Sequence, residues 1–213
     1  MSKAVLISIR PEWCEKIING QKTIEVRKTR PKMDTPFKCY IYCTKPEEKL
    51  LTIMKDGDEN YGETYHGKPV FIKTEKAPTT GLWDKRQKVI GEFTCNRVTN
   101  LFSNSRFWLD EDDVLHTCLS AAEMRKYANG AHGLYGWHIS DLRVYDHPRD
   151  LGEFAPVCRY KNDDGSCPSR RVACSYQKYD YNPDGSVNLV ECGRTLERPP
   201  QSWRYVEEEL WND

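Results

Sequence analysis

The chain has 213 residues, of which 38% are hydrophobic and 30% are charged, a composition typical of a soluble protein with a modest core and long polar loops. Its 32 basic and 32 acidic residues balance, so global charge gives no argument for nucleic acid. No apolar run approaches the roughly 18 residues needed to cross a bilayer, and the N-terminus lacks the features of a signal peptide. We therefore expect a cytoplasmic protein with no membrane partner.

The first part of the chain predicts strands around one short helix. Residues 4–9 are rich in β-formers and predict a strand. Pro11 suits the first turn of the helix that follows, and Gly20 ends that helix because glycine readily adopts the left-handed backbone. Two further strands are expected over 23–27 and 37–44.

The middle of the chain is less regular. Residues 46–80 form a polar insertion, in which we expect one short helix near 46–54. A clear strand follows over 88–98. Gly91 lies inside that strand, which indicates a bulge or a close approach of another backbone.

A second helix and another strand are predicted further along. Ser120 and Glu123 have the spacing of a capping box, and Gly130 lies where the helix should stop. Residues 134–139 predict a strand, which a turn separates from an extended segment over 142–145.

Short strands, two helices and long connections predict an α+β fold built on a small β-barrel or half-barrel. We expect one domain over residues 1–154, with flanking short helices, and a loop-rich C-terminal extension over 155–213 that packs on the barrel. Two prolines before Trp203 fix an extended backbone, which favours docking of the C-terminus onto the barrel. A ligand-side role for Arg198 or Gln201 is the alternative.

Nine cysteines without an export signal do not favour a disulfide framework. Five of them lie in apolar or strand-like runs and should be small buried hydrophobes: Cys14, Cys39, Cys43, Cys95 and Cys118. The four late cysteines lack the tight spacing of zinc knuckles. Free buried thiols, a structural zinc ion and a disulfide all stay open for Cys158, Cys167, Cys174 and Cys192; otherwise no cofactor is expected.

The segment after the first helix carries the most informative pattern. Gly20, Lys22, Glu25 and Arg27 form a Gly-x-Lys-x-x-Glu-x-Arg motif at the entry to a strand. Residues 22–38 hold six basic and two acidic side chains, which is compatible with a locally charged cleft; an ordinary solvated surface is the alternative.

This motif, with strand 89–93 and segment 136–142, resembles the ASCH domain family of the PUA-like superfamily, in the type carried by bacteria and their phages. The resemblance covers roughly residues 3–154. It implies a PUA-like small β-barrel with a cleft beside the motif helix, and a role in binding RNA or a nucleotide-like ligand.

Some small members of that family resemble amidohydrolases acting on acetylated cytidine, and others resemble ribonucleases. The amidohydrolase type uses a lysine, a threonine and a glutamate. Lys22 matches the lysine, Glu25 stands at the threonine position, and Glu123 is a loose candidate for the third residue. The missing nucleophile argues against simple transfer of that activity.

The residue types at the motif suit a nucleotide. Glu25 could accept hydrogen bonds from a base edge or an exocyclic amine. The cations that could hold phosphates are Arg27, Lys28 and Arg30. The side chains whose rings could stack on unpaired bases are Tyr135, Trp137 and His138. Alternatively, the motif is a salt-bridge network that only pins strand to helix, and His138 is a structural residue.

Three functions follow from this reading. The first is a module that binds RNA or a modified nucleotide in the motif cleft. The second is a hydrolase of RNA or acetylated cytidine, with Lys22 and Glu25 as catalytic candidates that transfer protons. The third is a phage or host regulatory protein with a protein partner. The pattern leaves the oligomeric state open.

Overall fold

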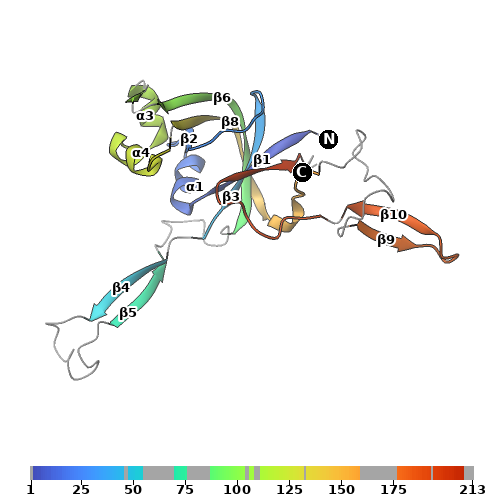
Figure 1. Ribbon diagram of the computed structural model, residues 1–213. Coiled ribbons are helices and arrows are strands. Elements are labelled where there is room, and N and C mark those ends of the chain that lie inside the picture. Colours follow the sequence, from blue (N-terminus) through green and yellow to red (C-terminus); the bar gives the residue numbers. More distant parts are fainter. Residues whose placement is uncertain are drawn as a thin grey trace.

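The computed structural model describes residues 2–45, 48–54, 70–75, 87–103, 106–107, 111–131, 133–158, 177–192 and 194–208 (Figure 1). The strands are β1 Lys3–Ile9, β2 Ile24–Arg27, β3 Phe37–Cys43, β4 Glu48–Met54, β5 Val70–Glu75, β6 Lys88–Ser103, β7 Arg106–Phe107, β8 Gly133–Arg149, β9 Gln177–Tyr181, β10 Val187–Cys192 and β11 Trp203–Glu207. The helices are α1 Pro11–Ile18, α3 Glu111–Thr117, α4 Ala121–Ala128 and the 3-10 turn η1 Leu151–Glu153. None of the described helices is long and apolar enough to span a membrane.

One mixed sheet dominates the fold, which is of the α+β class, as predicted. Its strand order is β11-β1-β3-β6-β8-β2, with β7 paired to β6. Only β1 and β3 run parallel; every other neighbouring pair is antiparallel. The hairpins β4–β5 and β9–β10 lie outside this sheet, on opposite sides of it (Figure 1).

The predicted closure into a barrel is wrong, because the terminal strands β2 and β11 do not pair in the described part of the chain. Here β2 is linked to the end of β1 and to the residue before β11 by side-chain hydrogen bonds, and not by backbone hydrogen bonds between strands. Arg27 of β2 donates from Nη2 to the Ser8 carbonyl oxygen at the end of β1, over 2.6 Å, and its Nη1 lies 3.4 Å from Ser202 Oγ, just before β11. The sheet therefore stays open at the motif.

The main core lies between α1 and the inner face of the sheet. Trp137 of β8 is fully buried there. Its ring packs edge-on against Phe37 and at a tilt against Trp203, each with a centroid separation of 5.8 Å. Because Trp203 comes from β11, this aromatic group joins the two ends of the sheet through its interior. Strand β11 of the C-terminal segment is also paired with β1 of the sheet.

Two of the three predicted helices form, with the expected caps. Pro11 begins α1, and Gly20 follows it with a φ of +71°. Ser120 and Glu123 form the capping box of α4: Glu123 N–H donates to Ser120 Oγ, and Ser120 N–H donates to Glu123 Oε2 over 2.8 Å. Asn129 then takes the left-handed backbone that ends α4.

Two segments differ from expectation. Residues 48–54 form strand β4 and not a helix, since they pair in register with β5. The expected turn near residues 140–141 is a bulge inside one long strand, β8, where Asp141 has a φ of 49°. The pairing of β6 with β8 continues on both sides of this bulge and overrides the local turn signal.

Gly91 of β6 sits where another backbone approaches closely, as predicted. An added Cβ would fall on the Arg143 carbonyl oxygen and lie 3.1 Å from Val144 Cα. Backbone of the neighbouring strand cannot move aside cheaply, so Gly91→Ala should cost about 1–3 kcal/mol in urea unfolding. Gly152→Ala is the control, because its Cβ would meet nothing within 4 Å. Equal stability of the two variants would contradict this account.

Four of the five early cysteines are fully buried, as predicted, while Cys118 is half-buried. Burial raises the pKa of the Cys95 thiol to about 12, and also raises the pKa values of Cys14 and Cys39. In the unfolded chain a thiol ionises near pH 8.5. Above that pH the native state therefore binds more protons, and stability that is complete at neutral pH is lost as the pH rises toward 12.

We expect urea unfolding under reducing conditions to give a lower free energy of unfolding at pH 9.5 than at pH 7.5. Cys95 alone should contribute about 1 kcal/mol of this loss. In Cys95→Ala the difference between the two pH values should shrink by that amount. An unchanged difference would show that this thiol is not held neutral by the fold.

Candidate functional site

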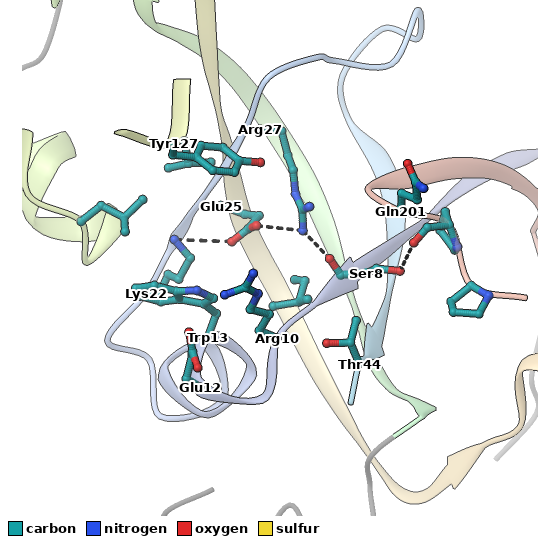
Figure 2. Close-up of a pocket in the computed structure, with 15 residues that line it drawn as sticks. Ser8, Arg10, Glu12, Trp13, Lys22, Glu25, Arg27, Thr44, Tyr127 and Gln201 are labelled. Carbon is teal, nitrogen blue, oxygen red and sulfur yellow. Dashed lines mark hydrogen bonds and ion pairs between the residues drawn. The ribbon is translucent and has the colours of Figure 1, made fainter. Parts of the chain in front are cut away.

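A cavity of about 640 Å³ lies beside the motif, where the end of β1, helix α1 and strand β2 meet (Figure 2). Its lining residues come from the N-terminal, middle and C-terminal parts of the chain: Ser8, Ile9, Arg10, Glu12, Trp13, Lys22, Glu25, Val26, Arg27, Thr44, Leu119, Tyr127, Pro199, Pro200 and Gln201. Three of these are basic and two are acidic, so the lining carries a formal charge of about +1 at neutral pH.

Lys22 stands at one side of the cavity with 2% of its surface exposed. Its Nζ donates to the carbonyl oxygens of Thr117 at 2.7 Å and Ile24 at 2.9 Å, and lies 3.4 Å from Glu25 Oε2. Burial lowers the pKa of Lys22, and the Glu25 carboxylate only partly offsets this effect. The three partners saturate the three donors of an ammonium group.

Glu25 links the two motif cations. Its Oε1 lies 3.0 Å from Arg27 Nη2 and its Oε2 faces Lys22, so both carboxylate oxygens are engaged (Figure 2). Arg27 is 7% exposed, and its buried Nε has no acceptor among the described residues. A buried donor without a partner costs about 1–3 kcal/mol. The predicted salt-bridge network is thus real, and it also lines an open cavity.

Local structure fixes this arrangement. The turn at Gly20 lets the N–H of Lys22 donate to the Lys16 carbonyl at the end of α1, over 3.0 Å. Strand β2 then pairs with β8, which sets Glu25 opposite Trp137. Helix α3, which the sequence reading missed, supplies the Thr117 carbonyl for Lys22.

Two aromatic side chains flank the motif charges. Trp13 of α1 is half-buried, and Lys22 Nζ lies 5.3 Å from its ring centroid. Tyr127 of α4 is 39% exposed on the other side, and Lys28 Nζ lies 5.3 Å from its ring centroid. Figure 2 shows Glu25 between these two rings. The cavity therefore offers apolar faces as well as charges.

The other predicted ligand contacts separate into three groups. Lys28 and Arg30 are exposed on the loop after β2, beside the cavity and outside its lining. Trp137 is fully buried in the core, so the expectation that it offers a stacking surface is wrong. The strand alternation decides this, since Trp137 faces inward and its neighbour His138 faces the other side of the sheet.

His138 lies outside the cavity. Its Nε2 lies 3.0 Å from Thr99 Oγ1 and its Nδ1 lies 3.3 Å from Arg97 Nη2, both on β6. Burial, followed by the Arg97 charge, lowers the pKa of His138. These contacts fit the structural role that was the alternative in the sequence reading.

Twelve of the fifteen lining residues were not assigned there by the sequence, or only as an alternative; those with polar or aromatic side chains are Ser8, Arg10, Glu12, Trp13, Thr44, Tyr127 and Gln201. Ser8 gave a signal, as a hydroxyl inside the apolar run of β1, and it is 7% exposed. Its Oγ donates to the Pro200 carbonyl oxygen over 2.6 Å, which holds the C-terminal segment against the cavity. The placement of Gln201 on the lining favours the ligand-side alternative for that residue.

Glu123 is exposed, and the hydrogen bonds from Ser120 lower the pKa of its carboxyl group. It serves as a helix cap and does not line the cavity.

The zinc question stays open. Cys158 is a free, half-buried thiol. Cys167 and Cys174 lie outside the described residues, as does the side chain of Cys192. Within the described residues, no three His, Cys, Asp or Glu side chains gather in a metal-like group.

The α+β sheet is thus open at a cavity that is lined by paired charges and aromatic side chains. No family model matches the chain. An ASCH domain-containing ribonuclease of Zymomonas mobilis is 28% identical over 79 residues, which cover 35% of this chain and 53% of the relative. This match agrees with the resemblance to the ASCH family that the motif indicates.

The chain spans about half the length of that relative. The crystal structure of ASCH from Zymomonas mobilis is similar with a TM-score of 0.44 and 19% identity, covering 70% of this chain and 73% of that one. A single-residue mutant of that protein gives a TM-score of 0.41 at 17% identity, covering 70% of this chain and 77% of the mutant.

Proposed function

We propose that this protein binds an unpaired nucleotide of RNA in the cavity beside the motif. The observation that carries the proposal is that Lys22, Glu25 and Arg27 line an open cavity although each is more than nine-tenths buried. A salt-bridge network that only joined strand to helix would not require a cavity of about 640 Å³ beside it. Cavities of roughly 300–1,000 Å³ suit small ligands.

The chemistry of the lining supports a nucleotide. Trp13 and Tyr127 offer faces on which a base can stack. Glu25 is a carboxylate with lone pairs left for an exocyclic amine, and the Arg27 Nε proton needs an acceptor such as a base carbonyl or phosphate oxygen. The ribonuclease name of the Zymomonas mobilis relative points to the same ligand class.

Fluorescence anisotropy with a labelled single-stranded RNA tests this function. Trp13→Ala should weaken binding about 5- to 100-fold, because stacking contributes about 1–3 kcal/mol per base. Leu115→Ala is the control, since it removes an apolar side chain that is 71% exposed and outside the cavity. If the folded Trp13→Ala and Arg27→Lys variants both bind RNA as tightly as the wild-type protein does, the assignment of the motif cavity as the RNA site is contradicted.

Hydrolysis of RNA is the second candidate function. The lowered pKa of Lys22 favours it, because a less basic amine more readily gives and takes protons near neutral pH. The relative named as a ribonuclease favours it too. Against it, all three donors of the Lys22 ammonium are occupied, so proton exchange requires the amine to be neutral first.

Cleavage of end-labelled RNA separates the two functions. If Lys22 transfers protons, Lys22→Arg should bind RNA yet lose cleavage, because an arginine stays charged. Wild-type cleavage should also rise with pH as Lys22 loses its proton. If RNA binds the wild-type protein and stays intact, the result supports the binding function and contradicts the hydrolase function. The same assay with acetylated cytidine tests the amidohydrolase expectation.

A further inference from the structure

A second concavity, of about 490 Å³, lies at the loop that follows the motif strand and has no part in the proposed function. It is lined by residues 28–34 of the loop after β2 and by Tyr135 of β8. The loop contributes three basic side chains, Lys28, Arg30 and Lys32, all exposed, and one acidic side chain, Asp34. Its surface is therefore positive and open to an anionic ligand.

The loop is held in shape from outside. The N–H of Lys32 donates to the Tyr205 hydroxyl over 2.6 Å, and Trp203 Nε1 donates to Thr29 Oγ1 over 3.0 Å. Both partners belong to β11, which is itself paired with β1. The positions of the loop cations are thus set by the sheet before any ligand arrives, which reduces the entropy lost on binding.

Lys28 joins the two concavities. It lines the second one, and its Nζ lies 5.3 Å from the ring centroid of Tyr127, which lines the first. Tyr135 pairs with Arg27 across β2 and β8, so a ring of the second concavity stands beside a motif cation of the first. One cation therefore stands where a ligand running from one concavity to the other would pass.

We infer that the second concavity is a subsite for the neighbouring nucleotide of the same RNA strand. Lys28 holds the phosphodiester that links the two nucleotides, Arg30 binds the next phosphate, and Tyr135 offers a face to the second base. The inference rests on the proposed function, and it defines the ligand as an oligonucleotide and not a free nucleotide. An acidic peptide would suit the cations but would make no use of Tyr135.

Calorimetry on the whole protein tests the subsite. The probes are the four nucleoside 5′-monophosphates and the four matching RNA dinucleotides that carry both a 5′ and a 3′ phosphate, so that the phosphates for Lys28 and Arg30 both lie on the 3′ side of the nucleotide in the motif cavity. The dinucleotides should bind about tenfold or more tightly, since a hydrogen bond to a charged group contributes about 1.5–3 kcal/mol. In Lys28→Ala combined with Arg30→Ala, this ratio should fall close to one while monophosphate affinity is retained. Lys3→Ala, an exposed lysine at the far end of β1, is the matched control and should keep the ratio.

The outcomes separate the two proposals. Monophosphates that bind as tightly as dinucleotides to the wild-type protein overturn the second subsite and leave the motif cavity standing. A ratio that survives the double substitution also overturns it. A tetraglutamate peptide that binds more tightly than the dinucleotides overturns it in favour of a protein ligand. If no nucleotide or RNA binds, the proposed function itself fails, and the subsite with it.

Discussion

Glu25→Gln should destabilise the protein by about 3–5 kcal/mol, because it leaves two buried cations without their common counter-charge. Lys22 and Arg27 lie 3.4 Å and 3.0 Å from the carboxylate oxygens and expose less than a tenth of their surface. The glutamine keeps the shape of the side chain, so the loss measures charge and not packing. Urea unfolding at pH 7 gives the free energy directly.

The pH dependence of this loss identifies its cause. Without Glu25, the pKa of Lys22 should fall further below its usual value, since burial then acts unopposed. The unfolded variant would bind more protons than the native one between that pKa and about 10.4, so its stability should recover as the pH rises through this range. A deficit that stays constant from pH 7 to 10 would mean that charge burial is not its origin.

Lys88→Gln is the matched control for an ion pair. Lys88 Nζ lies 2.9 Å from Asp150 Oδ1, closer than Lys22 lies to Glu25, but its partner is 72% exposed. An exposed pair contributes about 0–1 kcal/mol, so this substitution should change stability little. The burial of an ion pair, and not the distance between its atoms, therefore decides how much it contributes to the free energy of unfolding. Similar losses in the two variants would contradict that conclusion.

Trp137→Ala should mainly lower stability and Trp13→Ala should mainly lower RNA affinity, although both remove an indole near the motif. Trp137 is fully buried between Phe37 and Trp203, so its truncation should cost about 3–5 kcal/mol. Trp13 is half-buried at the cavity wall, and its truncation should cost only about 1–2 kcal/mol. Urea unfolding measures both losses.

RNA affinity should separate the same two variants in the other direction. Under conditions where both are folded, Trp13→Ala should bind labelled RNA weakly, while Trp137→Ala should bind much as the wild type does. Trp137→Phe, which retains an aromatic ring in the core, provides a more stable version of the second variant. If Trp137→Phe loses affinity as strongly as Trp13→Ala, the indole of Trp137 reaches the ligand after all.

Local sequence signals predicted the elements that carry the motif. Pro11 and Gly20 marked the ends of α1, and Ser120 with Glu123 marked the start of α4, because helix ends are specified by nearby backbone needs. The alternation of β2 likewise placed Glu25 and Arg27 together on one face. These features depend on residues only a few positions apart.

The features that sequence reading missed depend on distant partners. Residues 48–54 look helical alone and become a strand through β5. The motif alone did not reveal whether its charges pair or line a cavity; here they do both, because Ser8 and residues 199–201 complete the wall. The open sheet is also a long-range result, since it depends on how β2 meets β11. Patterns of neighbouring residues do not predict such contacts between distant parts of the chain.

The pairing of β1 with β11 has a consequence for the timing of synthesis. Lys3 pairs with Glu207, and the N–H of Ser8 donates to the carbonyl oxygen of Ser202 over 2.9 Å. The pairing of β1 with β11 therefore has to wait until β11 has been made. A ribosome adds about 5–20 residues per second, so the cavity wall stays incomplete for roughly ten seconds or longer after β1 emerges. A nascent chain thus lacks a finished wall of the motif cavity until residues 199–202 are released from the ribosome.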